Sequence, residues 1–166
     1  VNNPLRETNG HYEIDFEDLD RKLAGAKVLL MSSPHNPTGR VFTREELTRI
    51  GQLCVKHDVL ILSDEIHGDI VYAPQKFIHI ASIDDSIAAR TLTFIAPSKT
   101  FNIAGLSTSV SIVPNPVLNQ RLQEEYAKMH ADQGNIFGAV ALEAAYTHGD
   151  EWLEQLLQYL KGNVDY

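Results

Sequence analysis

The sequence is poor in cysteine, in positive charge and in long apolar runs. Cys54 is the single cysteine, which excludes an intrachain disulfide, and its place inside a predicted helix favours a small buried apolar role over that of a nucleophile. The formal net charge of −8 argues against a nucleic-acid or anionic-membrane surface, because phosphate groups are bound by clustered Lys and Arg. No apolar run approaches membrane-spanning length. We therefore expect no nucleic-acid partner, no membrane association and a reducing, cytoplasmic location.

The bulk composition permits a packed core. Of the 166 residues, 43% are hydrophobic and 22% are charged, which argues against wholesale disorder and fits one domain or a large part of one. The chain starts with Val1 rather than Met, and the last predicted helix runs into the final residues, 162–166, without a clear stop signal. We expect residues 1–166 to be a fragment of a longer protein.

Hydrophobic patterning predicts strands that are separated by helices. Thr43 and Glu46 form a capping box that starts one helix, and Asp15 is the expected N-cap of another. Strands are predicted at 27–31, 59–62, 91–95 and 109–113, and further helices at 16–23, 116–130, 136–147 and 150–160. The strands lack polar alternation, which is typical of strands buried on both faces. The predicted fold class is α/β, with a mostly parallel sheet and helices on both faces.

Three polar loops follow predicted strands, at the edge where parallel sheets bind ligands. In the stretch VLILSDEIH (59–67), a strand ends in Asp64 and Glu65, and two kinds of site have this pattern. A DExH-type nucleotide hydrolase would bind metal here, but it needs a glycine-rich phosphate loop that ends in Lys-Ser or Lys-Thr. Lys99-Thr100 has no glycine before it, and the chain contains no such loop. In the alternative site, the acid pairs with a cation that must stay protonated.

The other two loops supply an amide and a lysine. SSPHNPTG (32–39) is either an irregular loop or a rigid turn whose prolines and glycine present the Asn36 amide to a ligand. APSKTFNIAG (96–105) has Lys99 directly after an apolar strand. Lys99 is either a surface lysine or a desolvated one, whose pKa is lowered and which forms Schiff bases. Together with Asp64, these residues form the set that pyridoxal 5′-phosphate (PLP) requires: a lysine for its aldehyde, a carboxylate for its ring nitrogen and a donor for its ring oxygen.

The three motifs also resemble those of a known family. SPHNPTGRVF, LILSDEIHGDIVY and APSKTFNIAGL, in this order and spacing, resemble the fold-type I PLP enzymes of aminotransferase class I/II. The D-E-I-H tetrad and the opening NPL…NGHYEIDFEDLD are most similar to the cystathionine β-lyase (C–S lyase) branch. The resemblance covers the whole chain. It implies that residues 1–166 are part of the large PLP-binding domain of an aspartate aminotransferase-like enzyme, without its N-terminal segment and its C-terminal small domain.

The resemblance implies roles for five residues. Lys99 would be the catalytic lysine that forms the Schiff base and moves the α-proton of the substrate, and Asp64 would pair with the pyridinium nitrogen. Asn36 would donate to the ring 3-oxygen. His67 stands where many aminotransferases have a tyrosine near that oxygen, and Ser98 would help to hold the phosphate. No metal site is expected.

The chain departs from the family pattern at the phosphate site. Many aminotransferases have a serine three residues before the lysine and an arginine eight residues after it, whereas Ala96 and Ser107 stand here. The glycine-containing phosphate loop, the aromatic residue that stacks on the ring and the arginine that binds the substrate carboxylate are not found in this chain. We therefore expect the fragment alone to be inactive, and the full-length protein to be a homodimer that takes a small amino-acid substrate.

The implied activity is PLP-dependent β-elimination from cystathionine or cysteine S-conjugates, which gives a thiol, pyruvate and ammonia. A class I/II aminotransferase is the alternative, because both reactions share their first steps. Two further readings are less favoured. A DExH-type hydrolase lacks its phosphate loop and leaves Asn36 and Lys99 unexplained. The second less favoured interpretation is an inactive domain that keeps the fold but not the activity.

Overall fold

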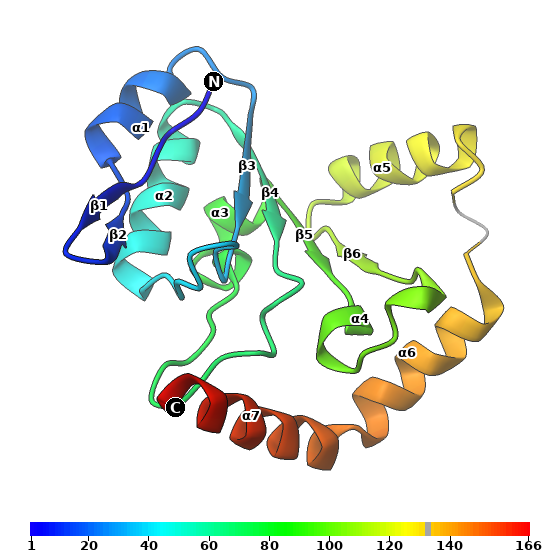
Figure 1. Ribbon diagram of the computed structural model, residues 1–166. Coiled ribbons are helices and arrows are strands. Elements are labelled where there is room, and N and C mark those ends of the chain that lie inside the picture. The colour runs from blue at the N-terminus through cyan, green and yellow to red at the C-terminus, as the bar shows by residue number, and fades with distance from the viewer. Residues whose placement is uncertain (132–133) are drawn as a thin grey trace.

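The computed structural model describes residues 1–131 and 134–166, and a four-stranded sheet organises them (Figure 1). The strands β3 (Val28–Ser32), β4 (Leu60–Asp64), β5 (Thr91–Ile95) and β6 (Val110–Ile112) lie in that order. The first three are parallel, and β6 pairs with β5 in the antiparallel direction. The predicted mostly parallel sheet is confirmed. Its antiparallel edge strand was not predicted, because an apolar run carries no information about direction.

The helices begin where local sequence provides N-caps. Asp15 accepts a hydrogen bond from the Asp18 backbone N–H (3.0 Å) and starts α1. Thr43 and Glu46 form the predicted capping box of α2. The helices are α1 (Phe16–Leu23), α2 (Arg44–Lys56), α3 (Asp85–Ala88), α4 (Pro97–Thr100), α5 (Pro116–Lys128), α6 (Ile136–His148) and α7 (Asp150–Asp165), with 3₁₀ turns η1 (Ile80–Ser82) and η2 (Ala104–Leu106).

A short hairpin precedes α1. Its strands β1 (Arg6–Thr8) and β2 (His11–Glu13) pair in the antiparallel direction around Asn9 and Gly10, both of which have positive φ. All six strand residues are exposed, so the hairpin has no apolar face for hydrophobic patterning to detect. The sequence analysis therefore predicted no strand at these positions.

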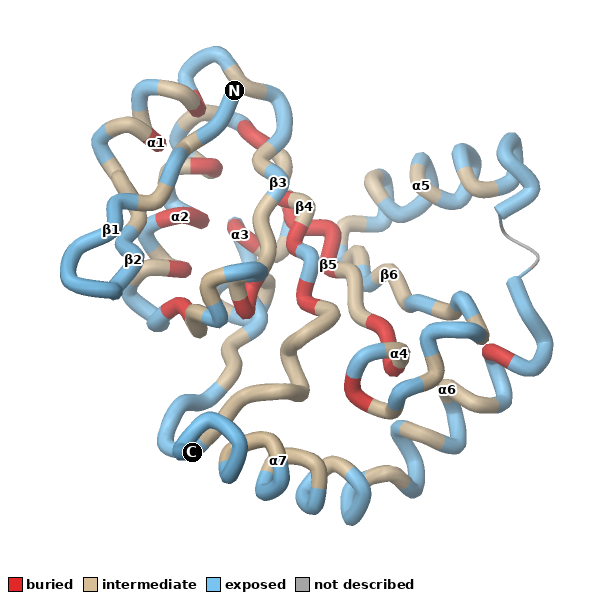
Figure 2. Tube along the Cα trace, viewed as in Figure 1, coloured by how far each residue is buried: buried red, intermediate tan, exposed pale blue. Residues whose placement is uncertain are grey.

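The core lies between the sheet and the helices α1, α2 and α3, where Figure 2 shows most of the buried residues. Cys54 is fully buried there, and burial raises the pKa of its thiol to about 12, which confirms the predicted apolar role. The other buried members of the cluster are Leu19, Leu23, Phe42, Leu47, Ile50, Val59, Ile61, Ile80 and Ile87. Burial of one such aliphatic side chain contributes about 1.5–3 kcal/mol.

The opposite face of the sheet is covered at one end only. Strand register aligns Ser32, Asp64, Phe94 and Ser111 in one row across that face. At the β6 end, the Ser111 hydroxyl is hydrogen-bonded to the Tyr126 hydroxyl of α5 (2.9 Å). At the β3 end, by contrast, Val28 is 46% exposed and Leu30 is 75% exposed. Helices therefore approach both faces, but this chain leaves half of one face open.

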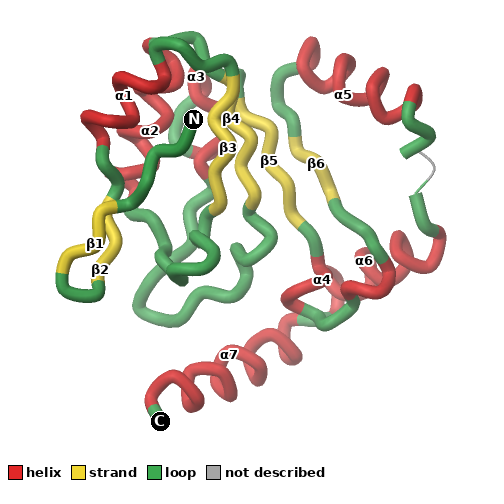
Figure 3. The backbone as a smooth tube through the Cα atoms, turned by 45° about the horizontal axis from the view of Figure 1, so that its top comes forward, coloured by secondary structure: helices red, strands yellow, loops and turns green. Residues whose placement is uncertain are grey.

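Helices α6 and α7 lie outside the sheet, and α7 passes below the loops at the carboxyl ends of the strands (Figures 1 and 3). Helix α6 is apolar over most of its circumference, yet Ile136, Phe137 and Val140 are 81%, 78% and 63% exposed. A helix that is apolar on all sides is normally covered by other protein. Among the helices of residues 1–131 and 134–166, none combines the length and the hydropathy needed to cross a bilayer.

Candidate functional site

The three parallel strands end at one edge of the sheet, and the candidate residues follow them there (Figure 3). Ser32 of β3 pairs with Asp64 of β4, which in turn pairs with Phe94 of β5, so the strand ends are nearly level. Asn36 lies four residues beyond Ser32, and Lys99 five residues beyond Phe94. The predicted convergence of the three loops at the carboxyl edge is therefore present in the backbone.

The loop after β3 is a closed turn with Asn36 at its exposed tip. The Gly39 N–H donates to the His35 carbonyl (2.7 Å), and the His35 N–H donates to the Arg40 carbonyl (2.7 Å). His35 Nδ1 is 2.8 Å from the Thr38 hydroxyl. Gly39 has φ +68°, a conformation that favours glycine, and the peptide bond after Asn36 is cis. The two backbone hydrogen bonds close the turn around Asn36, as expected for a rigid turn rather than an irregular loop.

Arg40 anchors this turn to its surroundings. Its guanidinium donates to both carboxylate oxygens of Glu46 (3.0 and 2.9 Å) and to the Tyr12 carbonyl (2.6 Å). The same group lies 5.2 Å from the centre of the Phe42 ring. Both contacts to Glu46 are made by the same nitrogen, Nη2, and the pair is partly buried, so solvent screens it less than an exposed ion pair. Arg40 thus connects the Asn36 turn to the start of α2 and to the β1–β2 hairpin.

The two acids at the end of β4 have opposite environments. Asp64 is exposed, and its Oδ1 accepts a hydrogen bond from the Ile66 N–H (3.2 Å). Glu65 is buried: Oε1 accepts from the Ser63 hydroxyl (2.8 Å), and Oε2 lies 2.5 Å from His79 Nδ1. Both Glu65 oxygens are engaged inside the protein, so Glu65 holds the loop and is not available to a nucleotide or a metal. Asp64 is the acid that faces the site.

His67 and Asn36 line the same hollow, which has a volume of about 690 Å³. Arg40, Tyr72 and His11 also contribute to its wall. The sequence predicted that His67 and Asn36 act at neighbouring points of one ligand, and the structure brings the two residues together. Asp64, Ser98 and Lys99 are not among the residues that line this hollow. They lie along the same sheet edge, on the side toward β5.

Lys99 is exposed, and Ser98 is half-buried. Both lie in α4, the single turn that follows β5. Within this turn Pro97 and Thr100 are the buried residues, so the chain is anchored on either side of the lysine while its side chain extends outward. The expectation of a desolvated lysine is therefore not met within the described chain, where the Lys99 side chain is exposed.

The candidate side chains keep free hydrogen-bonding capacity. In the part of the chain that the structure describes, the side chains of Asn36, His67, Ser98 and Lys99 make no hydrogen bond or ion pair, and Asp64 uses one oxygen only. An amide, an imidazole, a hydroxyl, an amine and a carboxylate are thus available at one edge. This donor and acceptor set fits the aldehyde, the ring oxygen and the ring nitrogen of PLP.

The fit is weaker at the phosphate end. Ala96 is buried and offers no side-chain donor, and Ser107 has left-handed backbone angles (φ 46°, ψ 49°) at the end of η2. Ser98 remains the hydroxyl that lies directly beside Lys99. The departures noted in the sequence therefore correspond to a site with few phosphate donors from this segment.

Two residues that contact the lysine turn were missed as functional candidates. Asp69 accepts a hydrogen bond from the Thr100 hydroxyl (2.9 Å), and Trp152 Nε1 donates to the Thr100 carbonyl (3.1 Å). The sequence feature that could have identified Asp69 is its position in the same motif, five residues after Asp64. For Trp152 there was no such signal, because a contact across 52 positions leaves no trace in a single sequence.

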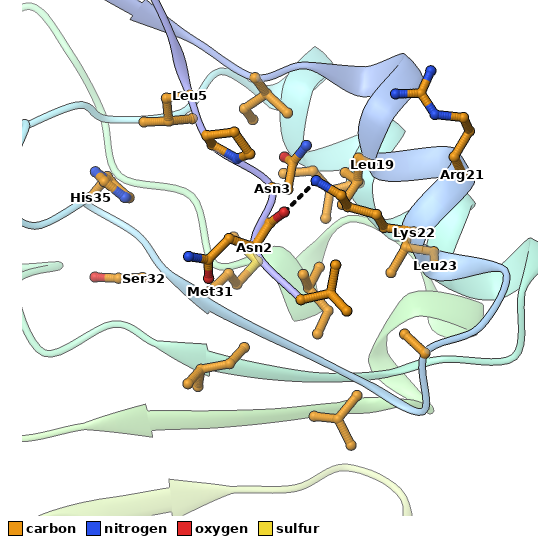
Figure 4. A pocket seen from close by; sticks show the side chains of 18 of the residues that line it. Asn2, Asn3, Leu5, Leu19, Arg21, Lys22, Leu23, Met31, Ser32 and His35 are labelled. Atoms are coloured by element: carbon orange, nitrogen blue, oxygen red, sulfur yellow. Dashed lines mark hydrogen bonds between the residues drawn. The ribbon is translucent and has the colours of Figure 1, made fainter.

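A larger hollow lies elsewhere, between the N-terminal segment, α1 and β3 (Figure 4). Its volume is about 1070 Å³, and its wall includes Leu5, Leu19, Met31 and His35. None of the five candidate residues lines it. The hollow runs along β3, which is an edge strand of the described sheet.

Comparison with known proteins agrees with this arrangement. The family described as aminotransferase class I and II matches residues 4–166. Cystathionine β-lyase PatB of Bacillus subtilis (strain 168) is 41% identical over 167 residues, a match that spans 99% of this chain and 43% of PatB. Kynurenine–oxoglutarate transaminase 3 of Rattus norvegicus is 36% identical over 115 residues, or 69% of this chain and 25% of that protein.

A solved structure has the same fold. The PLP-bound C–S lyase from Staphylococcus hominis superimposes with a TM-score of 0.91 at 38% identity, covering 100% of this chain and 42% of that one. The chain therefore spans less than half of the length of the relatives it matches. The family match covers nearly all of its residues, so this chain belongs to the aminotransferase class I and II family.

Proposed function

We propose that the complete protein is a PLP-dependent C–S β-lyase that acts on cystathionine or cysteine S-conjugates. The observation that carries the proposal is the free set of Asn36, Asp64, His67 and Lys99 at one sheet edge, in a chain 41% identical to a cystathionine β-lyase. Residues 1–166 would then form part of the large PLP-binding domain.

Each residue has a role that its position supports. When bound, PLP supplies an aldehyde that forms an imine with an amine and a pyridine ring that accepts electrons. Lys99 would be that amine, and its Nζ would take the proton from the substrate α-carbon. Asp64 would hold a proton on the ring nitrogen through its carboxylate, which is exposed and has one oxygen free. Loss of a thiolate from the β-carbon, followed by hydrolysis of the remaining three-carbon fragment by water, would give the thiol, pyruvate and ammonia.

Asn36 and His67 would act together at the ring 3-oxygen. They line one hollow from two different loops, and the Asn36 turn is held rigid by Arg40. His67 would donate to this oxygen through one ring nitrogen of its imidazole. Ser98 is the proposed phosphate contact from this segment.

A class I/II aminotransferase is the second candidate, and it is supported by the 36% identity to kynurenine–oxoglutarate transaminase 3. That match covers 69% of this chain, against 99% for PatB, which favours the lyase.

We also propose that the complete protein is a homodimer in the cytoplasm. The exposed apolar side chains of α6 fit a covered interface, and the single buried thiol fits a reducing compartment.

The proposal is tested with the complete protein loaded with PLP. Borohydride reduction, digestion and mass spectrometry should find the pyridoxyl label on Lys99, and Lys99→Ala should lose it. Lys76→Ala is the matched control, because Lys76 is an exposed lysine of the loop after β4. Asp64→Asn should bind the cofactor but lower kcat by about 10²-fold or more, since an amide does not hold the ring proton.

The reaction type follows from the products. A lyase forms pyruvate from cystathionine without added keto acid, whereas an aminotransferase requires 2-oxoglutarate and forms glutamate. Label on a different lysine would overturn the role of Lys99. Keto-acid-dependent turnover without pyruvate would replace the lyase by the second candidate.

A further inference from the structure

The residue after Lys99 is tied to the neighbouring strand end. Thr100 is fully buried, and its hydroxyl donates to Asp69 Oδ2 at 2.9 Å. A hydrogen bond from a hydroxyl to a carboxylate is charge-assisted and is about twice as strong as a neutral one. The lysine turn is therefore held by a strong bond at the position directly next to Lys99.

Asp69 belongs to the segment that carries Asp64 and His67. The backbone of this segment is folded on itself, since the Gly68 N–H donates to the Glu65 carbonyl (2.8 Å) and the Ile70 N–H to the His67 carbonyl (2.9 Å). The carboxylate thus connects the loop after β4 with the helix after β5. These two segments carry the proposed ring-nitrogen acid, Asp64, and the proposed imine-forming lysine, Lys99.

A second set of contacts holds the other side of the turn. Trp152 donates to the Thr100 carbonyl, and Phe101 stacks edge-on against Tyr146 with ring centres 5.8 Å apart. A Cβ on Gly149 would lie 2.3 Å from the Phe101 ring, so α7 begins in close contact with this turn. Thr100 is fixed through its hydroxyl and its carbonyl, while the adjacent Lys99 side chain remains free.

Two titratable groups lie near Asp69. The pKa of Tyr146 is raised by burial and by the Asp69 charge. The pKa of His79 is raised by its hydrogen bond to Glu65 and, to a smaller extent, by the charges of Glu65 and Asp69. In the described chain no cation pairs with Asp69, so the Thr100 hydroxyl is its side-chain partner.

We propose that Asp69 is a positioning residue for Lys99: its hydrogen bond to Thr100 sets the direction of the lysine relative to Asp64. The inference rests on the proposed function, because it assigns a task to the lysine that would hold PLP. A bound geometry that is wrong by about 1 Å costs on the order of 10²-fold in rate, so a bond that orients the lysine would be visible in the kinetics.

The test uses the complete protein with PLP and four variants. Asp69→Ala and Thr100→Val remove the bond, whereas Asp69→Asn and Thr100→Ser keep an acceptor and a hydroxyl in place. We expect the first two to lower kcat by about 10- to 100-fold with little change in KM. They should also change the visible circular dichroism of the bound cofactor and slow the borohydride labelling of Lys99. The conservative pair should restore both signals.

A double-mutant cycle separates positioning from a general structural role. If the bond is the cause, Asp69→Ala combined with Thr100→Val should lower kcat no further than either change alone. Additive losses, or unchanged dichroism and labelling in Asp69→Ala and Thr100→Val, would overturn the inference. If both of these variants fail to fold, the conservative pair decides. A wild-type circular dichroism spectrum of the cofactor in Asp69→Asn, together with an altered spectrum in Thr100→Ser, would then overturn the inference as well. Absence of label on Lys99 in the wild-type protein would overturn the proposed function itself, whatever the variants do.

Discussion

At the scale of single residues, Asp64 and Glu65 differ because successive strand residues point to opposite faces. Val59, Ile61 and Ser63 are buried on the core side, and Glu65 continues that series. Asp64 faces the other way. The motif predicted Asp64 rather than Glu65 as the functional acid, and the exposure of Asp64 and the burial of Glu65 are compatible with that prediction. The partners of Glu65 could not be predicted, because His79 is 14 residues away and its contact depends on how the intervening loop folds.

The Glu65–His79 pair predicts a pH dependence of stability. The hydrogen bond to Glu65 raises the pKa of His79 above its ordinary value of about 6.5. Its stabilisation is fully present below the unfolded-state pKa and is lost as the pH rises through the folded-state pKa. Urea unfolding of the complete protein should therefore show stability that falls as the pH rises above about 6.5, and His79→Gln should lose less stability over the same rise in pH.

His148→Gln is the control for this prediction, because His148 is exposed and lies at the end of α6, far along the chain from the pair. The control should keep the wild-type pH dependence. An identical pH dependence in wild type and His79→Gln would show that the pair does not contribute in this range.

At the scale of elements, the prediction succeeded where apolar periodicity and caps coincide. The bounds of α1 and β5 were predicted without error, and α6 differs by one residue. The hairpin β1–β2 and the single turn α4 lack these signals, since the hairpin is exposed on both sides and α4 is only four residues long. The antiparallel direction of β6 depends on its tertiary pairing with β5, which no local pattern encodes.

The contact between α2 and α3 predicts a stability change. A Cβ on Gly51 would lie 2.2 Å from Cδ1 and 2.7 Å from Cγ1 of Ile87, a fully buried side chain with little room to move. Gly51→Ala should therefore lower the free energy of unfolding by about 1–3 kcal/mol, although alanine is the better helix former. The measurement is urea unfolding of the complete protein.

Gly162→Ala is the matched control, because it is also helical and a Cβ there would meet no atom within 4 Å. It should be neutral or stabilising by up to about 1 kcal/mol. Ile87→Val removes the closest atom and should reduce the cost of Gly51→Ala. Equal effects of Gly51→Ala and Gly162→Ala would contradict the tight packing of α2 against α3.

At the scale of the whole molecule, exposed apolar surfaces and an exposed candidate site occur together. Leu30 on the sheet face, Phe137 on α6 and Lys99 at the sheet edge are all exposed in a chain that spans about 43% of the cystathionine β-lyase it matches. Contiguous exposed apolar surface normally marks an interface. The motifs predicted which residues of this chain form the candidate site, and their roles stay predictions; the exposure of Lys99 was not predicted, because burial depends on tertiary contacts that a motif does not encode.

This predicts different behaviour of the 166-residue chain and the complete protein. The chain alone should bind an environment-sensitive apolar dye and self-associate in gel filtration, and borohydride should not label Lys99 with pyridoxyl above the level of Lys76. The complete protein should show weak dye binding and specific label. Phe137→Ser in the chain should reduce dye binding, since Phe137 is 78% exposed, while Leu47→Ser, a change in the core, should increase it. A monodisperse 166-residue chain that is labelled at Lys99 as strongly as the complete protein would refute the dependence of the site on the rest of the molecule.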